Sequence, residues 1–382
     1  MRRALVLLLA AMSSAFSVHA AEALHVRFEA DAFNRAVPAS ARGNAVFSPY
    51  AFEIGCVALS DAFGPIVKAQ FAERLSVLTD LEQTYNPIVS RFRNFSATNG
   101  FSVLMARALC LPDRRMAQSS YRSEIQRLYA TEVCQAKPKD GVESWFRAML
   151  DGEMEDFALG DAPPQQNAYS YHEAVSVRFS WKEPFPTANT KDIAFHLADG
   201  GQRAVSAMRD LRMADIWEAK RFSMLRLPLA DGGWFFALLP AEGLSVGDIR
   251  SEFNSAKVDD LLTVMDSVTV TGVSHGPAAV VIPKMDITTE VGLSDAFAYF
   301  RFPLKGFARM NPELRPATVS QRMRFRLDEQ GLDPEPLVSK AEESQVRASA
   351  DTKKFVLNRP FLFFVFHMPT GTIPVAGQFT GR

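Results

Sequence analysis

The C-terminal part of the chain shows the clearest pattern of apolar and polar positions. Residues 323–327 alternate apolar and basic side chains, a period of two that predicts a strand with one buried face. Residues 361–366 form a continuous apolar run, typical of a strand buried on both faces. Residues 332–354, between them, are polar and lack a helical period. A long loop held at both ends by apolar strands is commonly functional, so we predict a displayed loop here.

Earlier segments predict a mixture of helices and strands. Ser48 and Pro49 suit the N-cap and the first turn of a helix, and apolar residues follow at helical spacing. Two apolar runs joined by the turn residues 231–233 predict a hairpin over 222–239. The other predicted elements are strands over 101–111 and 131–136 and helices over 118–129 and 142–150. Together these patterns favour an α+β fold.

Residues 1–20 have the layout of a secretory signal peptide. Arg2 and Arg3 give a positive start, an apolar run follows, and Ala20 ends the segment with a small side chain. The apolar run is too short to span a bilayer comfortably, and the alternative is a buried N-terminal helix. We therefore expect a protein with no membrane association, secreted to the extracellular space or the periplasm, with a single folded domain over residues 21–382.

Composition narrows the possible chemistry. The chain has 382 residues, 47% hydrophobic and 22% charged, with a formal charge of −1, so no basic surplus points to nucleic acid. Three cysteines leave one unpaired in an exported protein. Cys56 is expected in the core, whereas a bridge between Cys110 and Cys134 is a hypothesis. No histidines or cysteines have metal-ligand spacing, so we expect no metal and no cofactor.

One sequence pattern suggests an enzyme. Residues 272–276 fit G-x-S-x-G, the nucleophile elbow of hydrolases, with Ser274 as the candidate nucleophile. The elbow requires a strand before the serine and a helix after it, but residues 277–283 are typical of a strand. We therefore interpret the pattern as a β-turn that contains a serine, expect no catalytic residues, and keep a hydrolase at Ser274 as the alternative.

Several motifs resemble the serpin family. Residues 327–331 resemble the serpin hinge, and residues 358–363 with Gly377 resemble its C-terminal signature. The most specific internal match is the spacing W-x2-P-F-x4-T-x4-F, which begins at Trp181. The resemblance implies the serpin fold, with three β-sheets, one of them large and central, and about eight or nine helices. It also identifies residues 332–354 as an exposed reactive-centre loop.

The resemblance implies that this loop is offered to a protease. In inhibitory serpins the protease cuts the loop, which then inserts into the large sheet as a new strand and distorts the enzyme before it can complete hydrolysis. Inhibition is therefore a race between insertion and hydrolysis. The expected partner is a serine protease, with a trypsin-like enzyme as one candidate, or a cysteine protease, and we expect the protein to be a monomer.

The hinge departs from the family pattern. Glu329 and Gly331 match it, but Leu332 is bulkier than the small residue usual at that point. Pro334 and Pro336 lack the N–H that a central strand needs, and each buried acceptor left unpaired costs roughly 1–3 kcal/mol. We predict slow or blocked insertion and hence poor or absent inhibition. The alternatives are a non-inhibitory serpin that acts as a binding or scaffold protein, or an insertion favourable enough to tolerate both prolines.

Two further sets of positions follow from the resemblance. The region that lets the sheet open corresponds to Ser48, Glu173, Trp181 and Gln321, where Glu173 and Gln321 replace the usual Asn and His. A polar cluster of Ser48, Glu173 and Gln321 remains feasible. The resemblance does not single out one bond as the one presented to the protease, because this loop is longer than usual. The candidates are Gln345–Val346, by counting from the hinge, and Arg347–Ala348, by the preference of trypsin-like enzymes for Arg.

Overall fold

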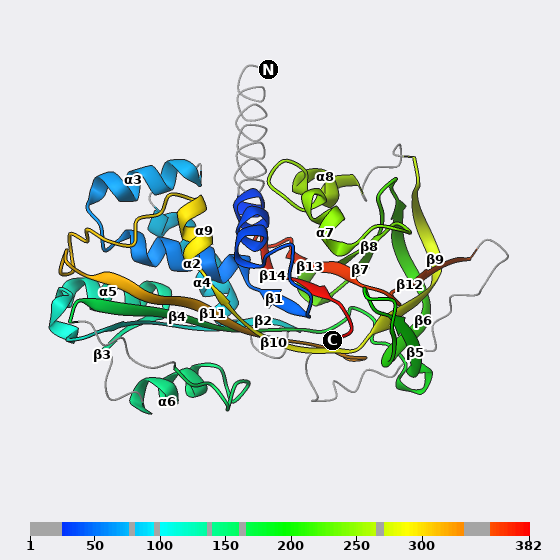
Figure 1. Ribbon diagram of the computed structural model, residues 1–382, viewed down its shortest axis with the longest axis horizontal. Coiled ribbons are helices and arrows are strands. Elements are labelled where there is room, and N and C mark those ends of the chain that lie inside the picture. The colour runs from blue at the N-terminus through cyan, green and yellow to red at the C-terminus, as the bar shows by residue number, and fades with distance from the viewer. Residues whose placement is uncertain are drawn as a thin grey trace, which may run out of the picture.

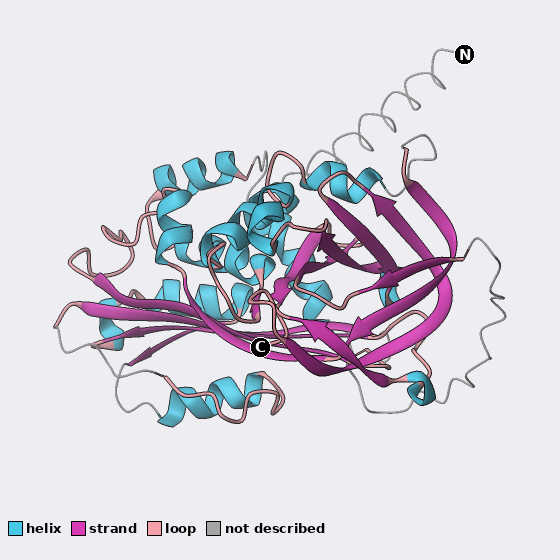
Figure 2. Cartoon of the chain, turned by 45° about the vertical axis from the view of Figure 1, so that its right-hand side comes forward, coloured by secondary structure: helices cyan, strands magenta, loops and turns pink. Residues whose placement is uncertain are grey.

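The computed structural model describes residues 25–75, 81–94, 100–135, 140–159, 166–264, 271–331 and 352–382. Within these residues the strands form one five-stranded and one nine-stranded sheet, and helices pack around them (Figures 1 and 2). The predicted α+β organisation is therefore confirmed. None of the helices in this part of the chain is both long and apolar enough to cross a bilayer.

The five-stranded sheet carries the features that matter for function. Its order is β10 (Met285–Gly292), β11 (Arg315–Leu327), β4 (Ala168–Phe179), β2 (Phe101–Leu111) and β3 (Thr131–Gln135). Strands β4 and β11 are parallel and pair from Ala168 opposite Arg315 to Val177 opposite Phe325. We refer to this pair as the β4–β11 boundary. Because it is hydrogen-bonded over nearly the whole of β4, the sheet is closed at its centre.

The nine-stranded sheet holds the C-terminal strands. Its order is β1 (Ala45–Phe47), β14 (Thr372–Phe379), β13 (Phe361–His367), β8 (Gly233–Pro240), β7 (Phe222–Pro228), β6 (Gln202–Glu218), β9 (Val273–Pro283) and β12 (Lys353–Val356), with β5 (Lys191–His196) paired to β6. We expected three sheets, but hydrogen bonding joins two of them. The reason is β6, whose 17 residues pair with β5 at one end and with β7 at the other.

The helices lie mainly on one face of the five-stranded sheet. They are residues 25–36, α2 (Pro49–Ser60), α3 (Pro65–Arg74), α4 (Leu81–Asn94), α5 (Ser119–Tyr129), α6 (Asp140–Met149), α7 (Val246–Ile249), α8 (Val258–Thr263) and α9 (Ser294–Tyr299). Within the described part of the chain, this set agrees with the expected eight or nine helices. Helix α6 lies on the face of the sheet opposite α2 and α4 (Figure 1).

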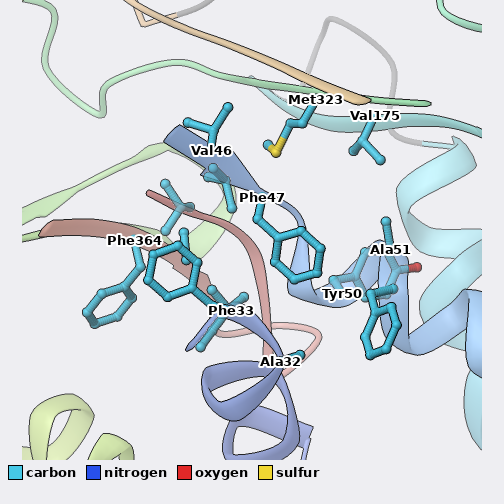
Figure 3. Packing of buried hydrophobic residues seen from close by; sticks show 14 of the residues in the cluster. Ala32, Phe33, Val46, Phe47, Tyr50, Ala51, Val175, Met323 and Phe364 are labelled. Atoms are coloured by element: carbon cyan, nitrogen blue, oxygen red, sulfur yellow. The ribbon is translucent and has the colours of Figure 1, made fainter. Parts of the chain in front are cut away.

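Helix α2 forms the centre of the core. The Ser48 hydroxyl accepts a hydrogen bond from the Ala51 N–H, as expected of an N-cap, and Pro49 occupies the first turn. All residues of α2 are buried. Figure 3 shows Phe47 and Tyr50 beside side chains of helix 25–36 and of the five-stranded sheet, including Val175 and Met323. The five-stranded sheet therefore packs against α2, the buried helix that begins directly after the predicted N-cap Ser48.

The two cysteines of the five-stranded sheet are bonded to each other. Cys110 of β2 and Cys134 of β3 lie directly opposite in the strand register and form a disulfide. The hypothesis of this bridge is confirmed. Cys56, in α2, is a buried free thiol, as expected.

Candidate functional site

The chain turns sharply where the hinge was predicted. Strand β11 ends at Leu327, and Asp328 and Gly331 then exchange backbone hydrogen bonds of 3.2 Å. Gly331 has φ of 101°, and a Cβ there would lie 2.2 Å from the Phe179 carbonyl oxygen. Only glycine fits this backbone. The hinge is therefore folded against the end of β4 and does not continue as a strand.

The motif that begins at Trp181 holds this turn. The Trp181 Nε1–H donates to the Asp328 carbonyl at 2.8 Å, and the Phe185 N–H donates to the Glu329 carbonyl at 2.8 Å. The Glu329 carboxylate accepts from Thr190 Oγ1 at 2.6 Å and from Lys284 Nζ at 2.8 Å. Burial raises the pKa of Glu329, but these two hydrogen bonds outweigh it and lower the pKa below its ordinary value. The hinge carboxylate is therefore held in its charged form.

Two details of this region were not predicted from the sequence. Strand β4 ends at Phe179, and Trp181 lies beyond its end, where it forms an isolated bridge to Leu229. The partner Lys284 was not foreseen, because it follows β9 and no local motif connects it with the hinge.

A buried polar cluster crosses the β4–β11 boundary on the core side. Gln321 of β11 lies opposite Glu173 of β4, and its Nε2 donates to the carboxylate at 2.8 Å. Gln321 Oε1 also accepts a hydrogen bond from the Ser48 N–H at 2.6 Å, and its Nε2 donates to the Ser48 carbonyl at 3.1 Å. The three residues predicted to form a polar cluster therefore meet, and they join the first residue before α2 to both strands of the boundary.

Two members of this cluster, Arg107 and Tyr171, were not predicted from the sequence. Arg107 of β2 lies opposite Glu173, with 3.4 Å between Nε and Oε1, and both side chains are fully buried. The Arg107 guanidinium also donates to the carbonyls of Ala51 and Tyr129, and the Tyr171 hydroxyl donates to Glu173 at 2.7 Å. A single arginine within the apolar run 101–111 was the signal that could have identified it.

Burial and charge compete at Glu173. Burial raises its pKa, and the Arg107 charge together with hydrogen bonds from Gln321 and Tyr171 offsets only part of that rise. The pKa remains above its ordinary value of 4.5. Loss of hydration therefore outweighs the favourable contacts of the Glu173 carboxylate.

An ion-pair network crosses the same boundary on the opposite face. Glu153, in the turn after α6, binds Arg178 of β4 at 2.6 Å and Arg326 of β11 at 3.5 Å. Arg324 Nη1 of β11 also donates to the Glu153 carbonyl at 3.0 Å. The network comprises Asp151, Glu153, Asp156, Arg178, Asp286, Arg322, Arg324 and Arg326. A strand that enters between β4 and β11 must break the contacts that join this turn to both strands.

The enzyme alternative lacks its structural context. Ser274 lies in β9, not in a β-turn as we interpreted it, and the turn precedes it at Gly272. Ser274 Oγ donates to the Ile216 carbonyl, whereas His275 pairs with Asp215 at 2.7 Å across the strand register. Because a strand continues after Ser274, no nucleophile elbow forms. The described residues also contain no group of side chains that could hold a metal ion.

Residues 332–351 of the predicted loop lie outside the described residues. This applies to Leu332, Pro334 and Pro336 and to the bond candidates Gln345, Val346, Arg347 and Ala348. The segments that flank it are described: the hinge turn lies at the end of the five-stranded sheet, and β12 begins at Lys353 in the other sheet, parallel to β9. The predicted loop boundary of 354 was therefore wrong by two residues, because Lys353 and Lys354 pair with Ala278 and Ala279 of β9.

The described arrangement is a five-stranded sheet closed at its centre, with a glycine turn after β11 and a buried polar cluster beneath the β4–β11 boundary. The family model described as serpin (serine protease inhibitor) matches residues 24–381, and the chain therefore belongs to the serpin family. It is 23% identical over 384 residues to plasminogen activator inhibitor 1 of Bos taurus, with 94% of this chain and 92% of that relative covered.

Two other comparisons show how wide the family is. The chain is 26% identical over 270 residues to the probable non-inhibitory serpin-Z5 of Arabidopsis thaliana, with 69% of this chain and 55% of that relative covered. The crystal structure of the thermophilic serpin tengpin in the native state has a similar fold, with a TM-score of 0.79 at 15% identity and 94% of each chain covered. Membership of the family is therefore compatible with either inhibition or its absence.

Proposed function

We propose that this protein presents residues 332–354 to a serine protease and that the cut loop inserts slowly or not at all, so the protein is a poor inhibitor or a protease substrate. The observation that carries this proposal is the β4–β11 pairing, which is in unbroken register from Thr318 to Phe325, combined with Pro334 and Pro336. An inserted strand must replace that ladder on both sides, and each proline removes one donor from it. Each acceptor left unpaired costs about 1–3 kcal/mol.

Three other features add to the barrier. The hinge turn must unfold, the Gln321–Glu173 hydrogen bond must break, and the turn around Glu153 must release at least one strand. These contacts delay insertion, but they do not slow the hydrolysis that releases the protease from the cut loop. Slow insertion therefore favours release of a cleaved serpin over a trapped protease.

The finer assignments are also proposals. Arg347–Ala348 suits a trypsin-like enzyme, Gln345–Val346 is the second candidate bond, and a cysteine protease is the second class of partner. The protein acts as a monomer and not as an enzyme. We also propose export, supported by the pattern of residues 1–20 and by the Cys110–Cys134 disulfide, since disulfides persist in oxidising compartments.

The second candidate function is a non-inhibitory serpin that binds a ligand or partner. It is supported by the hinge prolines and by a relative named as a probable non-inhibitory serpin. A small molecule or partner that stays bound through purification would favour this function.

The test is to treat the mature protein with trypsin and measure both products and stability. We expect a cut between residues 337 and 350, no complex that survives denaturing electrophoresis, and little change in melting temperature. The double substitution Pro334→Ala with Pro336→Ala should raise the melting temperature of the cut protein, because it restores two donors. A covalent complex and a large rise in melting temperature for the unsubstituted protein would refute the proposal. Arg347→Ala serves as the control for the position of the cut.

A further inference from the structure

The apolar run over residues 277–283 of β9 has one buried face and one open face. Side chains alternate between the two faces of a strand, and those buried in the core are Ala278, Val280 and Ile282. On the other face Pro277 is exposed, and Ala279 and Val281 are half-buried. An uninterrupted apolar run is typical of a strand that is covered on both faces. In the described part of the chain, the open face of β9 therefore lacks the cover that its sequence favours.

Strands β6 and β12 flank β9 and extend this open face. Met213 of β6 lies opposite Pro277 and is 54% exposed. Val356 of β12 lies opposite Val281 and is half-buried. We refer to the whole patch as the β9 face, which comprises Leu211, Met213, Pro277, Ala279, Val281 and Val356. An exposed apolar patch commonly marks an interaction site, and a methionine side chain adapts its shape to a partner.

The charges that accompany the β9 face are positive. Arg209 of β6 and Lys354 of β12 share its rows of the strand register, and Lys354 is exposed. The next carboxylate on this face of β6, Asp215, is paired with Arg226 at 2.8 Å and with His275 at 2.7 Å. Opposite charges steer association, whereas like charges oppose it. The β9 face therefore fits an apolar segment that is bordered by acidic groups.

The position of the β9 face indicates which partner reaches it. Strand β12 begins at Lys353, and the candidate bond after Arg347 lies six residues earlier in the chain. Six residues span at most about 20 Å, whereas even a small folded domain is about 30 Å across. A protease that binds at Arg347 therefore brings its own surface within reach of β12 and the strands beside it.

We propose that the β9 face is a second docking surface for the protease that cuts the loop, and that it selects enzymes whose surface there is apolar and bordered by acidic residues. This inference rests on the proposed presentation of the loop to a protease. It does not depend on slow insertion, because it concerns the encounter that precedes the cut and not the steps that follow it.

The test compares anionic and cationic trypsin, which share a preference for Arg and Lys but differ in surface charge. The value of kcat/KM for the first cut between residues 337 and 350 is measured on the mature protein and on a synthetic peptide of residues 332–356. The peptide contains the loop and β12 but lacks the parts of the β9 face that come from β6 and β9. We expect the ratio of the anionic to the cationic kcat/KM to be about tenfold higher on the protein than on the peptide at low salt. At about 1 M salt this preference should disappear.

Two exposed substitutions assign the effect to the β9 face. Met213→Ser should lower kcat/KM of anionic trypsin on the protein about fivefold, because it removes the most exposed apolar contact. Lys354→Glu should slow the anionic enzyme and speed the cationic enzyme on the protein, with a much smaller effect on the peptide. Ile66→Ser is the control, because Ile66 is 74% exposed and lies in α3, at the opposite end of the molecule from β9 and β12 (Figure 1). This variant should be cut at the normal rate.

The proposal is overturned if Met213→Ser and Lys354→Glu are cut as fast as the unsubstituted protein, if the peptide shows the same ratio as the protein, or if neither trypsin cuts the loop. A dimer in sedimentation experiments that disappears in Met213→Ser would assign the β9 face to a second copy of the chain and would also overturn it. A covalent complex with trypsin would contradict the proposed slow insertion but leave this inference intact, because either enzyme must reach the loop before a complex forms.

Discussion

The two faces of the five-stranded sheet stabilise the β4–β11 boundary in different ways. On the core side, Arg107, Glu173 and Gln321 are fully buried. On the other face, Glu153 is 13% exposed while its partners Arg178 and Arg326 are 25% and 40% exposed. Loss of one partner from a buried pair leaves a charge away from water, whereas exposed pairs contribute little and are screened by salt. The two faces should therefore differ in both the size and the salt dependence of mutational effects.

The largest effect is expected for Arg107→Met. This change leaves Glu173 buried without its cationic partner and should lower the unfolding free energy by about 3–5 kcal/mol near neutral pH. Urea denaturation measures this loss. The double variant Arg107→Met with Glu173→Leu removes both charges and should recover most of it. A single variant that is as stable as the unsubstituted protein would contradict the importance of the buried pair.

The next effect is expected for Gly55→Ala in α2. A Cβ at Gly55 would lie 2.1 Å from Glu173 Oε1 and 2.4 Å from the Tyr171 hydroxyl oxygen. The carboxylate must shift, at a cost of about 1–3 kcal/mol. Gly43→Ala is the matched control, because a Cβ there meets no atom within 4 Å. Equal stability of the two variants would show that the buried polar cluster tolerates displacement.

A smaller effect is expected for Glu153→Gln on the opposite face. The substitution removes the carboxylate that pairs with Arg178 and Arg326 and should cost about 1 kcal/mol or less at low salt. The difference should disappear at about 1 M salt, which shortens the screening length to a few ångströms. Glu155→Gln, an exposed neighbour, is the control. A loss of unfolding free energy that persists at high salt would show that the ion pairs of Glu153 behave like buried pairs.

The smallest expected effect is a pH dependence from Glu173. Burial raises its pKa in the folded state above 4.5, so the folded protein keeps this proton at pH values where the unfolded chain has lost it. The unfolding free energy should therefore fall as pH rises from about 4.5 through the raised pKa. Burial also raises the pKa of Glu29, which contributes to the pH dependence in the same direction. Urea denaturation at several pH values measures how the unfolding free energy depends on pH. The part of this dependence that is lost in Glu173→Gln is the contribution of Glu173. An unchanged pH dependence in this variant would contradict the assignment.

Sequence patterns predicted elements better than contacts between them. The alternation at 323–327 and the apolar run at 361–366 correspond to β11 and β13. Such strands can be predicted because each buried position of a strand requires an apolar side chain in the local sequence. The meeting of Ser48, Glu173 and Gln321 was foreseen only through the family resemblance. Glu153 could not be predicted, because its partners lie on distant strands and an acidic residue in a turn is usually solvated.

The Cys110–Cys134 disulfide bears on how this molecule would respond to mechanical force. It joins β2 to β3 covalently at Cys110 and Cys134, so these two strands cannot be separated at that point, and α5 lies within the covalently closed segment. The β4–β11 boundary has only non-covalent contacts. A force applied across the strands of the five-stranded sheet cannot separate β2 from β3 and is therefore carried by the non-covalent strand pairs, of which β4–β11 is one.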